Sequence, residues 1–154
     1  MSVETQLSSP WLSPQVLRFL PPAIGWLGVG WNLFGAVQLL RTLTQTQADL
    51  LAMGLTLEQT VAATSVPTWM NLAFVAGVLG GFVGSVLLLG QRRLALPIFA
   101  ASLAGYLVLF VGDITEGIFA AFGAPQVAIL TTVVAIAAGL LAWSYRLRER
   151  GALR

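Results

Sequence analysis

Four long stretches of the chain are almost entirely apolar, and short polar segments separate them. They cover residues 21–40, 67–89, 94–112 and 125–145, and each has proline at or near its first turn. A helix needs about 20 largely apolar residues to cross a bilayer, and proline fits a first turn because the missing N–H has no partner there. The pattern predicts an all-α fold, an integral membrane four-helix bundle formed by a single membrane domain, residues 1–154.

Two segments outside these spans are predicted to be ordered. Residues 1–20 end in an apolar run that is too short to cross a bilayer, so we expect an interfacial amino-terminal segment. The loop at 42–66 is longer than a bare connector needs to be. Its Thr56-Leu57-Glu58-Gln59 is typical of a capping box, in which two side chains satisfy backbone N–H groups at a helix start. The loop is therefore predicted to form one or two short helices that rest on the outer ends of the bundle.

The segment at 114–122 leaves two arrangements open. A helix that starts at Arg93 and rises about 1.5 Å per residue reaches the far boundary near Gly112, so Asp113 would lie at the rim. Segment 114–122 then either folds back along the interface or extends the third and fourth helices into a longer hairpin that turns at Gly123.

Composition supports a membrane location. The chain of 154 residues is 57% hydrophobic and 9% charged, whereas a soluble domain has about 25% charged residues. The mean hydropathy of +0.85 cannot be hidden in the core of a domain this small. The bilayer is therefore the expected solvent, with lipid as one partner.

The arginines predict the orientation. All eight basic residues are arginine. With four spans, only Arg41 falls on one side, and the other seven fall on the side that carries the termini and the Arg92-Arg93 turn. The positive-inside rule places that side, and both termini, in the cytoplasm. The basic balance thus indicates topology, and no basic soluble face suggests nucleic acid as a partner.

The missing residue types exclude most chemistry. The chain has no cysteine and no histidine, so thiolate catalysis, sulfur or imidazole metal ligands and the usual proton carrier are absent. No nucleophile has a base beside it, and no phosphate-binding glycine loop follows a strand. We expect no enzymatic activity, no cofactor and no metal site.

Small residues recur at helical spacing inside the spans. Such residues allow close helix approach in lipid, and packing within the chain is the favoured interpretation, with a homo-oligomer or docking onto a larger membrane complex as the alternative. The glycines concerned are Gly28, Gly35, Gly77, Gly80, Gly81, Gly84, Gly105 and Gly139.

Polar residues inside spans are the first place to look for function. The amides of Asn32, Gln38 and Asn71 are candidates to line a pocket that opens outward, although hydrogen bonds across helices from Asn32 and Asn71 are the simpler interpretation. Asp113 and Glu116 lie one turn apart at the rim, where a carboxylate pair can bind a cation or share a proton. Two solvated carboxylates are the simpler interpretation there.

The order of several motifs resembles a known family. These motifs are Trp31-Asn32 with Gly35, Pro67-x-Trp69, Phe74 before a glycine stripe to Gly84, Leu87-Leu88-Leu89 before Arg92-Arg93, Ala95, Ser102-Leu103, and Trp143-x-Tyr145 before Gly151. From about Trp26 onward the chain is similar to small four-helix proteins of the bacterial inner membrane that often carry the label "sugar transporter". The resemblance implies a multi-pass location in the bacterial inner membrane, with no catalytic or substrate motif to transfer.

Two functions are weighed. The leading expectation is a non-enzymatic accessory or packing subunit that associates through its glycine-rich faces with itself, lipid or a larger complex. The alternative is a small-solute carrier, with sugar as the solute that the family label implies, which works as an oligomer with a polar route near Asn32, Gln38 and Asn71. A membrane enzyme or quinone-binding protein is disfavoured by the missing histidine.

Overall fold

Every regular element in the computed structural model, which describes residues 14–154, is a helix. The seven helices in this range are α1 (Pro14–Thr44), α2 (Gln47–Ala52), α3 (Leu57–Thr64), α4 (Thr68–Leu89), α5 (Ala95–Thr115), α6 (Ile118–Phe122) and α7 (Ala124–Glu149). Four segments are long and apolar enough to cross a membrane, namely Pro22–Thr44 within α1 and the whole of α4, α5 and α7. The lengths and the apolar composition of these four helices are those of a multi-pass membrane protein.

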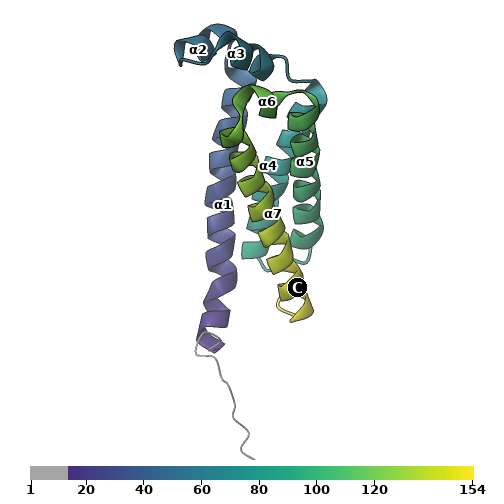
Figure 1. Cartoon of the computed structure of the whole chain (residues 1–154). Coiled ribbons are helices and arrows are strands. Elements are labelled where there is room, and N and C mark those ends of the chain that lie inside the picture. Colours follow the sequence, from purple (N-terminus) through teal and green to yellow (C-terminus); the bar gives the residue numbers. More distant parts are fainter. Residues whose placement is uncertain (1–13) are drawn as a thin grey trace, which may run out of the picture.

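The long helices do not all pack against one another. Helix α4 packs against both α1 and α5, and α7 packs against α5. Helices α1 and α7 are not a closely packed pair, and Figure 1 shows them side by side with α4 behind. The contact between α1 and α7 is thus the loosest one around the four long helices.

Glycines bring α4 and α5 into direct backbone contact. A Cβ added at Gly105 would lie 2.8 Å from both the Ala73 carbonyl oxygen and the Gly77 nitrogen. At this crossing the Ser102 hydroxyl donates a hydrogen bond of 2.6 Å to the Gly77 carbonyl oxygen. On the same stripe, Gly80 faces Ser102, and Gly84 faces the ring of Phe99. The close approach therefore leaves no room for larger side chains.

The α1–α4 contact uses a second set of glycines. Gly28 lies against Ser85, and Gly35 is in ordinary contact with Val78. Gly81 lies against the side chain of Asn32. On α7, by contrast, a Cβ at Gly139 would meet no atom within 4 Å, so this glycine is on an open surface.

The first helix starts earlier than the predicted first span. Helix α1 begins at Pro14, so residues 14–20, which the sequence assigned to the interfacial segment, are continuous with the first long helix. Residues 1–13, the remainder of that predicted segment, lie outside the described residues.

Two short helices form in the loop at 42–66, and both have capping boxes. At α3 the Thr56 side chain accepts from the backbone N–H of Gln59, whose side chain accepts from the Thr56 N–H in return, which confirms the predicted box. A second box at α2 joins Thr46 and Asp49. Hydrogen bonds from the backbone N–H and the hydroxyl of Thr46 hold the pKa of Asp49 below its ordinary value of 3.8.

Segment 114–122 folds into a separate short helix. Helix α5 ends at Thr115, and α6 is bounded by Gly117 and Gly123, whose φ angles of 75° and 70° lie in the region that favours glycine. Helix α6 packs against α3, α5 and α7, and the Gln59 side chain donates to the Ala121 carbonyl oxygen (3.3 Å). The continuous long hairpin is therefore wrong, and the chain folds back across the helix ends (Figure 1).

At the end of the long helices opposite α6, apolar side chains form a closely packed core. A core cluster there combines α4, α5, α7 and the last residues of the chain, and consists of Leu88, Ala95, Phe99, Leu140, Leu147 and Leu153. The tail is held by backbone hydrogen bonds from Arg93 to Arg154 (2.9 Å) and from Arg154 to Gln91 (2.7 Å). These contacts keep Leu153 only 2% exposed and close the end at which α4 turns into α5.

Candidate functional site

A cavity of about 630 Å³ lies among the long helices at the end that carries α6. We call it the α1–α7 pocket. Residues of α1 and α7 form its two sides, residues of α4 and α5 form its floor, and α6 with Ala63 and Val66 closes its end. The absence of close packing between α1 and α7 explains why the space is not filled.

The exposed lining residues show where the pocket opens. They are Phe34 and Thr42 on α1 and Ala128, Ile129 and Thr132 on α7, whereas every lining residue on α4, α5 and α6 is buried or half-buried. The mouth therefore runs between α1 and α7, on the side of the helices. On α1 the pocket lining extends from Trp31 to Thr42, which is about 16 Å at about 1.5 Å per residue.

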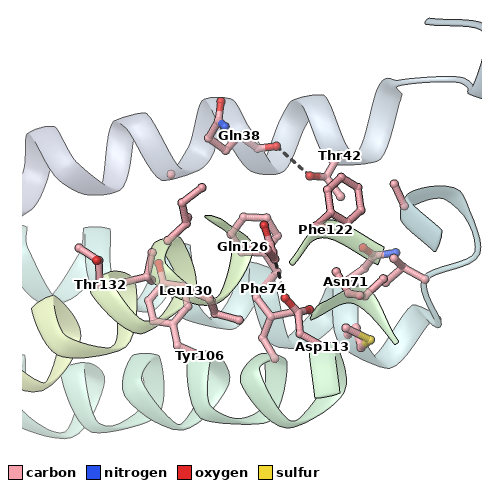
Figure 2. A pocket seen from close by; sticks show the side chains of 18 of the residues that line it. Gln38, Thr42, Asn71, Phe74, Tyr106, Asp113, Phe122, Gln126, Leu130 and Thr132 are labelled. Atoms are coloured by element: carbon pink, nitrogen blue, oxygen red, sulfur yellow. Dashed lines mark hydrogen bonds between the residues drawn. The ribbon is translucent and has the colours of Figure 1, made fainter. Parts of the chain in front are cut away.

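Polar and apolar groups lie toward opposite ends of the pocket. Trp31, Tyr106, Leu130 and Val133 line the part nearer the middle of the long helices. The other polar lining side chains, apart from Thr132 and the hydroxyl group of Tyr106, lie toward α6, and they are Gln38, Thr42, Asn71, Asp113 and Gln126. Figure 2 shows Asp113 and Gln126 turned toward each other, whereas the amide end of Gln38 points away from them. A mainly apolar cavity with a few converging polar groups is typical of a small-molecule site.

Asp113 is the acidic residue of the pocket lining. It lies in the last turns of α5, is only 4% exposed, and accepts a hydrogen bond of 2.9 Å from the side-chain nitrogen of Gln126 on α7 (Figure 2). Helix α5 ends at Thr115, and the chain turns back so that α7 starts near the end of α5. This turn places Gln126 beside Asp113. The pair thus joins two sides of the pocket.

The three amide side chains that the sequence singled out lie in two different environments. Gln38 and Asn71 line the α1–α7 pocket, which opens between α1 and α7 and not outward as predicted. Asn32 is 2% exposed, lies outside this pocket, and donates to the Gly28 carbonyl oxygen of its own helix (2.8 Å). The expected hydrogen bond from Asn32 across helices is therefore wrong, because its side chain is pressed against Gly81 and turns back on α1.

The two carboxylates that were predicted to lie at the rim, those of Asp113 and Glu116, differ in burial. Glu116 is exposed at the end of α5, as expected for a solvated carboxylate. Asp113 is buried, so the expectation that it is solvated is wrong. Arg41 is exposed and does not line the pocket. Within residues 14–154, no three Asp, Glu, His or Cys side chains are grouped as they would be to hold a metal ion.

Sequence reasoning missed Gln126 and the aromatic lining. Gln126 follows Pro125 at the start of the fourth apolar stretch, and only its place opposite Asp113 gives it a role. Phe74, Tyr106 and Phe122 are single aromatic residues in apolar runs, with no pattern to distinguish them from core or lipid-facing positions. The one signal in the sequence that could have indicated Gln126 is its position as a polar residue near the start of an apolar span.

No family model matches the chain, and neither a curated protein nor a solved structure matches it.

Proposed function

We propose that the chain is a four-helix bundle of the bacterial inner membrane, with both termini in the cytoplasm, that binds one small amphiphilic molecule in the α1–α7 pocket. The observation that carries the proposal is the pocket itself, a mainly apolar cavity of about 630 Å³ in which most of the polar side chains lie toward the α6 end. An amphiphile has the same division between head group and tail. The arginine distribution supports the orientation, which places the α6 end outside.

The binding proposal develops the carrier hypothesis, because Gln38 and Asn71 of the predicted polar route line the pocket. The mainly apolar lining suits an amphiphile better than a sugar, whose hydroxyl groups would each need a partner. The core cluster around Phe99 and Leu153 fills the other end of the bundle, so within residues 14–154 the pocket has no continuation toward that end. The proposed function is therefore binding without transport.

The accessory-subunit hypothesis receives less support. Its basis was the availability of glycine faces for a partner, and the glycines at 28, 77, 80, 81, 84 and 105 lie against side chains or backbone of this chain. Of the glycines singled out from the sequence, Gly139 has the open surface that a partner would need.

Saturable binding of a neutral amphiphile tests the proposal. The protein in phosphatidylcholine nanodiscs is titrated with radiolabelled dodecanol, and empty nanodiscs give the background. We expect one binding site per chain. Ala128→Trp places a large ring at the exposed mouth of the pocket and should weaken binding at least tenfold.

Ala138→Trp is the matched control, since Ala138 is exposed on the same helix but does not line the pocket. It should bind dodecanol like the unaltered chain. Equal binding by the two tryptophan variants, or no binding above the lipid background, would contradict the proposal.

A further inference from the structure

The α1–α7 pocket contains a buried carboxyl group, and no basic side chain of the described residues lines it. Asp113 is 4% exposed and accepts a hydrogen bond from the neutral amide of Gln126. None of the described residues that line the pocket is arginine, and the chain has no lysine or histidine. Any positive charge that reaches this carboxylate inside the pocket must therefore come from a ligand.

A buried carboxylate is costly unless a counter-charge or several donors stabilise it. A bond from Gln126 supplies one donor, and a carboxylate has room for about four. A positively charged ligand group beside Asp113 would stabilise the carboxylate, which the single hydrogen bond from the neutral Gln126 amide stabilises only in part. An anionic head group would add repulsion at the same place.

The other groups at this end also suit a cation. Asn71 carries an amide oxygen that can face a positive charge. Phe74 and Phe122 lie beside the polar groups in the pocket (Figure 2), and aromatic faces attract ammonium groups. The α6 end of the pocket therefore offers an amide oxygen and aromatic rings in addition to Asp113.

We infer that the pocket selects amphiphiles with a positively charged ammonium head group, which is held at Asp113 while the apolar tail extends toward Trp31. This inference rests on the proposed function and adds the charge of the ligand to it. The distance of about 16 Å along α1 between Trp31 and Thr42 gives the tail its space. The side mouth between α1 and α7 lets such a molecule enter with its tail in lipid.

Three probes with the same tail test the inference on the unaltered protein. Radiolabelled dodecyltrimethylammonium, dodecanol and dodecanesulfonate are titrated separately into protein nanodiscs of phosphatidylcholine, with empty nanodiscs as background. We expect the cation to bind at least tenfold more tightly than the alcohol, and the sulfonate to bind more weakly than the alcohol. Equal binding of cation and alcohol, or tighter binding of the sulfonate, would overturn the inference about charge and leave the amphiphile pocket in place.

Two variants assign the charge effect to one residue. Asp113→Asn keeps an acceptor for Gln126 and removes the charge, so it should reduce the preference for the cation, the ratio of the affinities for dodecyltrimethylammonium and dodecanol, at least tenfold. Glu116→Gln removes an exposed carboxylate three residues away, outside the pocket lining, and should keep the full preference for the cation. A loss of preference in Glu116→Gln as large as in Asp113→Asn would refute the assignment to Asp113.

The experiment separates the two proposals. If no probe binds saturably, the proposed function fails and the inference fails with it. If dodecanol binds and the cation has no advantage, only the inference fails. Should Asp113→Asn not fold, the three probes on the unaltered protein still decide whether the pocket prefers a cation.

Discussion

Replacing Gly105 by alanine tests whether direct backbone contact holds α4 and α5 together. The new Cβ would lie 2.8 Å from the Ala73 carbonyl oxygen and 2.8 Å from the Gly77 nitrogen, about 0.6 Å inside the 3.4 Å at which ordinary contact begins. Both partners are backbone atoms, so neither can rotate away as a flexible side chain would. Helix α5 must therefore move outward, and the hydrogen bond from Ser102 to Gly77 must lengthen with it.

The magnitude follows from a comparison with Gly139. Overpacking a tight contact costs about 1–3 kcal/mol, and replacing glycine by alanine inside a helix gains up to about 1 kcal/mol in helix propensity. Gly139→Ala has the same propensity gain, and its Cβ meets no atom within 4 Å. The difference between the two variants thus isolates the packing term, and we expect Gly105→Ala to be less stable than Gly139→Ala by about 1–3 kcal/mol.

Unfolding by sodium dodecyl sulfate in mixed micelles, followed by circular dichroism, measures this difference. Gly139→Ala should unfold at the same or a higher fraction of dodecyl sulfate than the unaltered protein, and Gly105→Ala at a lower one. Equal midpoints for the two alanine variants would refute the argument, because they would mean that the α4–α5 crossing has room for a methyl group.

Three further predictions follow from single contacts. Ser102→Ala removes the hydrogen bond to Gly77 and should lower stability in the same assay by about 0.6 kcal/mol, the average for such bonds between membrane helices. Leu153→Ala removes a side chain that is 2% exposed and should cost about 2–4 kcal/mol; a loss below 1 kcal/mol would mean that the tail does not belong to the core. Because hydrogen bonds from Thr46 lower the pKa of Asp49 below 3.8, the capping box should be complete above that pH and be lost as the pH falls through the lowered pKa. The protection factor of the Thr46 amide hydrogen, which is the intrinsic exchange rate at each pH divided by the rate measured by NMR, should fall over that acid range, and an unchanged protection factor would contradict the role of the ionised carboxylate.

Helix positions were predictable because the physics is local. An apolar run of about 20 residues can satisfy its backbone in lipid only as a helix, so α4 falls at Thr68–Leu89 where residues 67–89 were predicted. The capping box at Thr56 was readable for the same reason, since both of its hydrogen bonds join residues three apart. The start of α1 at Pro14 is not predictable in this way, because the proline pair at 21–22 is typical of a helix boundary.

The pocket could be predicted only in part, because it depends on contacts between distant segments. Gln38 and Asn71 were visible as polar residues in apolar runs, and both line it. The burial of Asp113 depends on the fold of α6 and on the return of α7, which sequence spacing does not reveal. The direction of the Asn32 side chain depends on its contact with Gly81 across two helices, and a single sequence contains no record of that contact.

The sideways mouth of the α1–α7 pocket has a consequence for how its occupancy must be measured. Phe34 and Ile129 at the mouth belong to helices that are suited to span the membrane, so a molecule arriving there diffuses within the leaflet and has already left the aqueous phase. Occupancy then follows the mole fraction of ligand among the lipids, and an affinity expressed per litre of water also contains the partition coefficient. Adding plain phospholipid at a constant total amount of ligand should therefore empty the pocket, although the volume of buffer has not changed.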